Sequence, residues 1–295
     1  MSAAPAIEAR GSGWRAAAGT AAALAICQLA ACASLSPAPP ATTASVAAAA
    51  SPATAASLAA LAARERALRS VRSGAIMEFS AADGHHFRTH EEIALARPAS
   101  IRVEAVAPFG ATMVLAADDA GRLMIFDPSR NVLMSGDANA ATLARYVNIP
   151  LAPPAAVDLL MGLPPDPAQL ATPPDTVAES EGMTLMTWRM SDGGTRALGF
   201  TQAGGGSGEL GMVRESDRAG ATRYEVRYGD WRDIGGVEFP LKVEAGFSSS
   251  RIALRYQAPA LNPTLAPAMF VLTPAPGTRQ ISIDAGGAAA PGAAG

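Results

Sequence analysis

Apolar and polar residues alternate along several short segments of this chain. Ile101, Val103 and Ala105 alternate with the charged residues Arg102 and Glu104. Successive side chains of a β-strand point to opposite faces, so this period of two predicts antiparallel strands with one buried and one solvated face. Segments with the same period, or with an apolar run of strand length, are found at 75–80, 111–117, 122–127, 131–135, 223–228, 241–247 and 251–256.

Three other segments are predicted to be helices. Residues 57–70 repeat leucines at helical spacing, with Val71 continuing the same side. Asp137 or Asn139 is expected to cap a second helix, because short polar side chains satisfy the free N–H groups of a first turn. The proline pair 153–154 opens a third helix, since proline is well tolerated at the first helical position.

The order of these elements is typical of α+β proteins. A helix is followed by about five or six short strands, two helices and about five more strands. Because the alternation gives each strand one apolar face, a single large curved sheet with the helices against its concave side accounts best for this order.

The N-terminal segment carries the features of an export signal. Arg10 and Arg15 provide a positive start, and residues 16–26 form an uncharged, mostly small and apolar run. A run of about 11 residues fits a secretory signal peptide, whereas a membrane-spanning helix needs roughly 20. The segment is therefore predicted to be removed from the mature protein.

The sequence Leu29-Ala30-Ala31-Cys32 ends this segment and resembles the lipobox of bacterial lipoproteins. The resemblance implies that the Cys32 thiol receives a diacylglycerol before the chain is cut. Each buried acyl methylene contributes roughly 0.8 kcal/mol, so two or more chains anchor a protein stably. Ala33 stands where an Asp retains many lipoproteins at the inner membrane, which favours the periplasmic face of the outer membrane. The alternative is an ordinary signal peptide that contains a cysteine.

Composition divides the chain into four parts. These are a lipoprotein signal peptide at 1–31, a flexible Ala/Pro/Ser/Thr tether at 32–54, one folded domain at 55–284, and a disordered Gly/Ala/Pro tail at 285–295. The only cysteines are Cys27 and Cys32, so the domain is expected to have no disulfide and no cysteine-based metal site. The net charge of −3 gives no indication of nucleic-acid binding.

Three stretches of the domain resemble the lipoprotein acceptors and carriers of the LolB and LolA family. Residues 101–115 (IRVEAVAPFGATMVL) are similar to the acceptor's strand–loop–strand, 147–164 (VNIPLAPPAAVDLLMGLP) to a lid helix, and 261–277 (LNPTLAPAMFVLTPAPG) to the carrier ending. The resemblance implies an unclosed, strongly curved antiparallel β-barrel of about 10–11 strands, with helices packed on the concave face as a plug or lid. The C-terminus is longer than in the shorter acceptors.

The same resemblance implies a hydrophobic cavity that takes up lipoprotein acyl chains. Burial of each methylene is worth roughly 0.8 kcal/mol, so such a cavity holds acyl cargo in water. The candidate lining residues are Met77, Phe79, Ile101, Val103, Leu115, Ile125, Leu160, Trp188, Tyr224 and Val226. The alternative is that these side chains fill a closed core.

Phe109 lies between Pro108 and Gly110, at the expected tip of a loop. An exposed apolar residue is costly unless it contacts lipid or a partner. In the acceptors, an exposed apolar residue of the matching loop assists membrane insertion of cargo, so the resemblance assigns that role to Phe109. The alternative is that Phe109 folds inward and caps the core.

Other candidate chemistry is sparse in this sequence. His85, His86 and His90 match no zinc-site spacing, and the first two are expected at a hairpin tip. The run GGGSG at 204–208 lacks the ending of a phosphate-binding loop and is expected to connect two strands. No nucleophile–base set or cofactor motif is found, so neither an enzyme, a metal site nor a cofactor is expected.

Together these features predict an outer-membrane-anchored lipoprotein that binds acyl chains and helps to receive or insert lipoproteins or another lipid. A periplasmic carrier protein is the expected protein partner, and the chain is expected to act as a monomer. The alternative is a structural or sensory periplasmic lipoprotein that uses the same fold to bind a protein partner. A closed, packed interior would favour this alternative.

Overall fold

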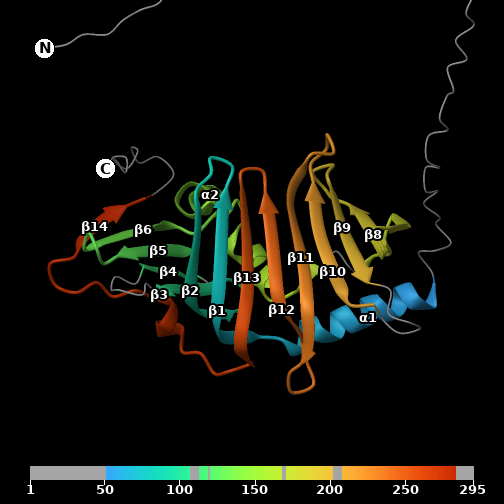
Figure 1. The fold of residues 1–295 in the computed structure, drawn as a ribbon, viewed down its shortest axis with the longest axis horizontal. Coiled ribbons are helices and arrows are strands. Elements are labelled where there is room, and N and C mark those ends of the chain that lie inside the picture. The colour runs from blue at the N-terminus through green and yellow to red at the C-terminus, as the bar shows by residue number, and fades with distance from the viewer. Residues whose placement is uncertain (1–50, 107–112, 119, 168–170, 202–207, 284–295) are drawn as a thin grey trace, which may run out of the picture. The chain divides into compact units, whose positions relative to one another are not determined.

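A computed structural model of the chain describes residues 51–106, 113–118, 120–167, 171–201 and 208–283. Among these residues, none of the helices is both long enough and apolar enough to cross a membrane. The described residues form one very large β-sheet and three α-helices (Figure 1).

Fourteen strands make up the sheet. They are β1 (Ser70–Ala81), β2 (His86–Ala96), β3 (Ser100–Val106), β4 (Met113–Ala117), β5 (Arg122–Asp127), β6 (Val132–Asp137), β7 (Thr176–Ser180), β8 (Met183–Arg189), β9 (Thr195–Thr201), β10 (Leu210–Ser216), β11 (Thr222–Asp233), β12 (Glu238–Phe247), β13 (Ser250–Leu261) and β14 (Arg279–Ser282). Their order is β14-β6-β5-β4-β3-β2-β1-β13-β12-β11-β10-β9-β8-β7.

The sheet is curved and unclosed, with β14 and β7 as its edges in the described part of the chain. Neighbouring strands are antiparallel except for β14, which runs parallel to β6. The first strand of the chain, β1, pairs with β13 at the middle of the sheet (Figure 1). The predicted α+β class and the large antiparallel sheet are therefore confirmed, whereas closure toward a barrel and a lid role for the helices stay predictions.

The predicted helices are found, each with a local reason for its start. Helix α1 (Pro52–Ala67) is capped by the Ser51 hydroxyl, which accepts a hydrogen bond from the Thr54 amide at 3.1 Å. Helix α2 (Ala140–Val147) is capped by the Asn139 side chain, which accepts from the Thr142 amide at 3.0 Å. Helix α3 (Pro153–Leu160) opens with its proline pair.

The predicted end of the first helix was wrong. The chain leaves the helix after Ala67, and Val71 lies fully buried on β1 instead of on a helical face. Asn262, at the end of β13, holds this point: its side chain donates to the Ala67 carbonyl at 2.9 Å and accepts from the Arg69 amide at 2.7 Å. A contact so distant in sequence overrides the helical spacing of the leucines.

The sheet has more strands than the ten or eleven predicted. The additional strands β7 to β10 carry little alternation, and β9 is buried at five consecutive positions, 196–200. A run that is buried on both faces gives no period of two. The fourteenth strand, β14, is short and exposed, and it gains its place only by pairing with β6.

The main hydrophobic core lies on one face of the sheet, which we call the inner face. Leu61 of α1, Leu143 of α2 and Val157 of α3 belong to the same buried cluster as residues of the sheet. A smaller cluster lies on the other face, where Val271 and Leu272 pack against strands β4 to β6. The 3-10 helix η3 (Pro267–Phe270) precedes these two residues, so the carrier-like ending at 261–277 covers part of the outer face.

Gly162 joins the end of α3 to the sheet at a position that no other residue fits. Its φ of +72° lies in the left-handed region, and a Cβ placed there would be 2.6 Å from Cγ of Pro240 on β12. Both the backbone conformation and the close approach to Pro240 therefore require glycine.

Replacing Gly162 by Ala is expected to lower the free energy of unfolding by roughly 2–5 kcal/mol. Left-handed backbone costs a non-glycine residue roughly 1–2 kcal/mol, and displacing Pro240 costs roughly 1–3 kcal/mol more. Gly182→Ala is the matched control, since its φ is +73° but no atom lies within 4 Å of the added Cβ. Urea unfolding measures both variants, and equal losses would contradict a contribution from Pro240.

Candidate functional site

The inner face of the sheet carries apolar rows that cross many strands in register. Residues directly opposite each other on paired strands point to the same face. One such row runs through Phe87, Phe79, Ile252, Ala245, Val226, Val213, Leu198, Met186 and Val177. The inner face therefore offers an apolar surface that extends from β2 to the far edge of the sheet.

The structure places the ten predicted lining residues on or against this face. Ile101, Ile125, Trp188, Tyr224 and Val226 are buried members of the core cluster. Met77, Val103, Leu115 and Leu160 pack against the cluster and are only partly buried. Phe79 stacks on Phe87, with ring centroids 4.9 Å apart. Their gathering in one place accords with either a lining or a core, so a role in ligand binding stays a prediction.

Burial on the inner face is uneven, and one region of it is open. Phe87 and Met113 are 46% and 51% exposed although both are large and apolar. Met77, Val103 and Leu115, which lie beside them on β1, β3 and β4, are partly buried. We call these five residues the rim patch. Solvent exposure of large apolar side chains on one face marks a surface suited to apolar ligands.

The predicted insertion loop connects β3 to β4 next to the rim patch. Pro108, Phe109 and Gly110 lie outside the described residues, as does the lipidation site Cys32. Their roles stay predictions. Met113, the first residue of β4, is the nearest exposed apolar residue that follows this loop in the described chain.

Helix α3 is fastened to the inner face through the carbonyls of its last turn. The Tyr228 hydroxyl on β11 donates to the Leu159 carbonyl at 3.0 Å, and the Tyr256 hydroxyl on β13 donates to the Leu160 carbonyl at 2.9 Å. Carbonyls at a helix C-terminus have no partner within the helix, so these phenols satisfy groups that would otherwise be buried unpaired. Burial raises the pKa of Tyr256, which keeps its hydroxyl a donor.

A second attachment of α3 is ionic. Asp158 Oδ1 lies 2.9 Å from Nε of Arg97, and Nη2 of Arg97 donates to Glu65 on α1 at 2.8 Å. Burial raises the pKa of Asp158 to about 6, although the Arg97 guanidinium acts in the opposite direction. Arg97 therefore links α1 to α3 through two carboxylates.

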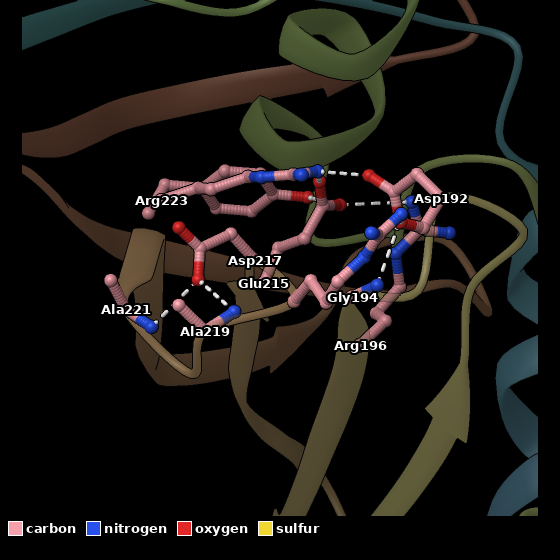
Figure 2. Close-up of polar contacts among 10 residues, drawn as sticks. Asp192, Gly194, Arg196, Glu215, Asp217, Ala219, Ala221 and Arg223 are labelled. Atoms are coloured by element: carbon pink, nitrogen blue, oxygen red, sulfur yellow. Dashed lines mark hydrogen bonds and ion pairs between the residues drawn. The ribbon is translucent and has the colours of Figure 1, made fainter.

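A buried polar network at β9 to β11 holds the chain that follows α3 (Figure 2). Arg196 Nη2 donates to Glu215 Oε2 at 3.1 Å, and the Tyr224 hydroxyl donates to the same oxygen at 2.9 Å. Arg223 donates to Glu215 Oε1 at 3.2 Å, and Nη1 of Arg196 donates to the Pro165 carbonyl at 2.6 Å. Each buried charge here has opposite charges or donors around it.

Sequence analysis missed this network. Glu215 and Arg196 belong to β10 and β9, strands that carry little alternation. The sequence carries one signal that could have indicated a buried pair: charged residues stand within otherwise apolar runs, as in RALGF and LGMVRES.

The histidines lie where the sequence predicted. His85 is in the turn between β1 and β2, His86 begins β2, and His90 is exposed further along that strand. Within the described residues, no three His, Cys, Asp or Glu side chains gather in a way that would hold a metal ion.

Comparison with known proteins finds no matching family of sequences and no matching curated protein. A DUF1329 family protein from Desulfovibrio piger is similar in structure over 74% of this chain and 96% of that protein, with a TM-score of 0.51 and 9% identity.

Two further structures carry lipoprotein-related names. A LolA superfamily protein from Nitrosomonas europaea matches 74% of this chain and 98% of that protein, with a TM-score of 0.48 and 11% identity. An outer membrane lipoprotein-sorting protein domain from Vibrio parahaemolyticus matches 72% of this chain and 95% of that domain, with a TM-score of 0.44 and 8% identity. LolA-like proteins are thus among the structural neighbours, as the sequence resemblance predicts, and the likeness concerns the fold alone.

The raised pKa of Asp158 predicts how stability depends on pH. The folded protein binds this proton more tightly than the unfolded chain, whose ordinary pKa is 3.8. The stabilisation is therefore complete below about pH 4 and is lost as the pH rises through about 6. At 1.36 kcal/mol per pKa unit, it amounts to about 3 kcal/mol.

Asp158→Asn is expected to flatten this part of the curve of unfolding free energy against pH. Asp230→Asn, at an exposed ion pair with Arg255, is the control that should keep it. Urea unfolding at intervals from pH 4 to pH 7 provides the measurement. An unchanged slope in Asp158→Asn would show that another group is responsible.

Proposed function

We propose that this protein binds acyl chains on the inner face of its sheet, in the bacterial cell envelope. The observation that carries the proposal is the rim patch, whose exposed Phe87 and Met113 lie on the same face of the sheet as the buried apolar rows. The sequence resemblance to lipoprotein acceptors and carriers supports the same ligand class.

The energetics of the rim patch favour an elongated apolar ligand. Apolar surface left in water is unfavourable by roughly 25 cal/mol per Å², and an acyl chain gains roughly 0.8 kcal/mol for each methylene that it buries. Phe87 and Met113 stand on β2 and β4, with β3 between them. A chain lying across these strands covers both side chains and reaches the partly buried Met77 and Val103.

Helix α3 sets how much of the inner face a ligand reaches. Its two carbonyl contacts with Tyr228 and Tyr256 and its ion pair with Arg97 are all polar, and its buried apolar residues, such as Val157, cover the deeper rows. Movement of α3 away from the sheet would uncover those rows without unfolding any strand. This is the plug or lid role that the resemblance implies.

The proposal extends to a cellular role in lipoprotein reception or insertion. Acylation of Cys32 would hold the protein at the periplasmic face of the outer membrane, and residues 33–50, which precede helix α1 and its cap, would let the domain reach from it. Phe109, between Pro108 and Gly110, would help cargo to enter the membrane. A periplasmic carrier would deliver that cargo.

The binding proposal is tested with two neighbouring residues that face opposite sides of β1. Met77→Arg places a charge on the rim patch, whereas Ile76→Arg places the same charge on the outer face of the strand. We expect Met77→Arg to weaken binding of a fluorescent acyl-ester probe at least tenfold and Ile76→Arg to leave it unchanged. Thermal unfolding of each variant verifies that the domain is folded, and Met77→Trp, which fills the site without a charge, gives a second measure.

Failure of the wild-type domain to bind any acyl probe would overturn the proposal. The deep burial of the inner-face rows would then favour the alternative, a structural or sensory lipoprotein that binds a protein partner. Native mass spectrometry of residues 51–283, purified from a bacterial periplasm, distinguishes the two by the presence or absence of co-purified acyl ligand.

Anchoring is tested separately by labelling with radioactive palmitate in a Gram-negative host. The full chain and Cys27→Ala are expected to incorporate the label, because Cys27 precedes the predicted cleavage site. Cys32→Ala is expected to lose it entirely. Equal labelling of Cys32→Ala and the wild type would show that the lipobox assignment is wrong.

A further inference from the structure

One carboxyl group on the inner face is left without a full set of partners. Glu91 on β2 is only 2% exposed. The Thr89 hydroxyl donates to its Oε1 at 2.5 Å, and its Oε2 is buried with no hydrogen-bond partner among the described residues. Buried polar atoms are nearly always paired, so an unfilled oxygen in an apolar face needs an explanation.

Glu215 lies on the same face, and its carboxylate does have a full set of partners. Glu215 receives hydrogen bonds from Arg196, Arg223 and Tyr224. Glu91 has no cation among the described residues within ion-pair distance and a single hydroxyl as donor. The fold thus surrounds the Glu215 carboxylate with donors, whereas the Glu91 carboxyl keeps one oxygen without a hydrogen-bond partner among the described residues.

The residues directly opposite Glu91 have small side chains. Glu91 stands directly opposite Ala75 on β1 and Ala105 on β3, two of the smallest side chains that a strand can carry. Ala105 in turn stands opposite Met113, the exposed residue of the rim patch. Glu91 therefore lies in the same row as Met113 of the rim patch, with Ala105 between the two.

A buried carboxyl without a cation is most stable as the neutral acid. Burial raises the pKa of Glu91, while the Thr89 hydrogen bond acts in the opposite direction. In the neutral acid, Oε1 accepts from Thr89 and Oε2 carries the proton. The unpaired oxygen is then a hydrogen-bond donor that has no acceptor among the described residues.

We propose that Glu91 binds the carbonyl oxygen of an acyl ester or acyl amide whose chain lies along the rim patch. The inference rests on the proposed acyl-binding function and adds the ligand group that the site selects. Acyl esters and amides carry one acceptor oxygen next to a long apolar chain, and both parts find a counterpart here. A free fatty acid would instead bring a second acid to a site that holds no cation.

The experiment compares two ligands of equal length, one with a carbonyl and one without any acceptor oxygen. Methyl dodecanoate and tetradecane compete for the protein against a fluorescent apolar probe at pH 4.5, the ordinary pKa of a glutamate, above which burial raises the pKa of Glu91. We expect Glu91→Met to weaken binding of the ester about tenfold, the effect of one hydrogen bond formed in an apolar site, and to leave binding of tetradecane unchanged. Glu91→Gln keeps a donor at this position and should keep the affinity for the ester.

Glu92→Met is the matched control, because Glu92 is the exposed neighbour on the opposite face of β2. The infrared carbonyl band of ¹³C-labelled methyl dodecanoate, bound to the unaltered protein, needs no variant: a hydrogen bond from Glu91 moves it to a lower wavenumber than in dodecane. An unchanged affinity for the ester in Glu91→Met, or an unshifted band, would overturn the assignment of Glu91. Absence of binding by both ligands would instead overturn the acyl-binding function itself.

Discussion

The structure depends on covering the inner face of a sheet that does not close. A barrel buries its interior by joining its edges, but this sheet ends at β14 and β7, and its apolar rows would otherwise meet water. Helices α1, α2 and α3 supply the missing cover, and they share one core cluster with the strands. The cover is incomplete at the rim patch. An open sheet therefore gains a region of accessible apolar surface that a closed barrel of the same strands would lack.

Polar contacts decide how that cover is held. The last turn of α3 presents carbonyls that water would normally satisfy, and Tyr228 and Tyr256 on the sheet satisfy them instead. Arg97 adds an ionic contact whose strength varies with the charge of Asp158. Hydrogen bonds of this kind contribute roughly 1 kcal/mol each, less than a well-packed apolar contact. The helix is thus positioned by polar contacts that are individually weak, in addition to the burial of apolar residues such as Val157.

Sequence periodicity predicted the parts of this fold whose two faces differ. Strand β3 alternates because Arg102 and Glu104 lie on its outer face, where they form an ion pair, and α2 begins after Asn139 because the cap is local in sequence. Strands β9 and β10 went undetected because burial on consecutive positions removes the period. Pairings distant in sequence, such as Asn262 with Arg69 or Arg196 with Glu215, leave no trace in a local pattern. Membership of the inner face was predictable residue by residue, whereas the partners of each polar side chain there were not.

The pairing of β1 with β13 has a consequence for folding during synthesis. These two strands lie side by side at the middle of the sheet, although Val71 and its partner Leu261 are separated by nearly the whole domain. In the described part of the chain, the two halves of the sheet, β2 to β6 and β7 to β12, are joined through this pair. Folding dominated by such distant contacts is slow. The sheet stays divided until Leu261 has been synthesised, so almost all of the domain exists as a chain before its central pair of strands can form.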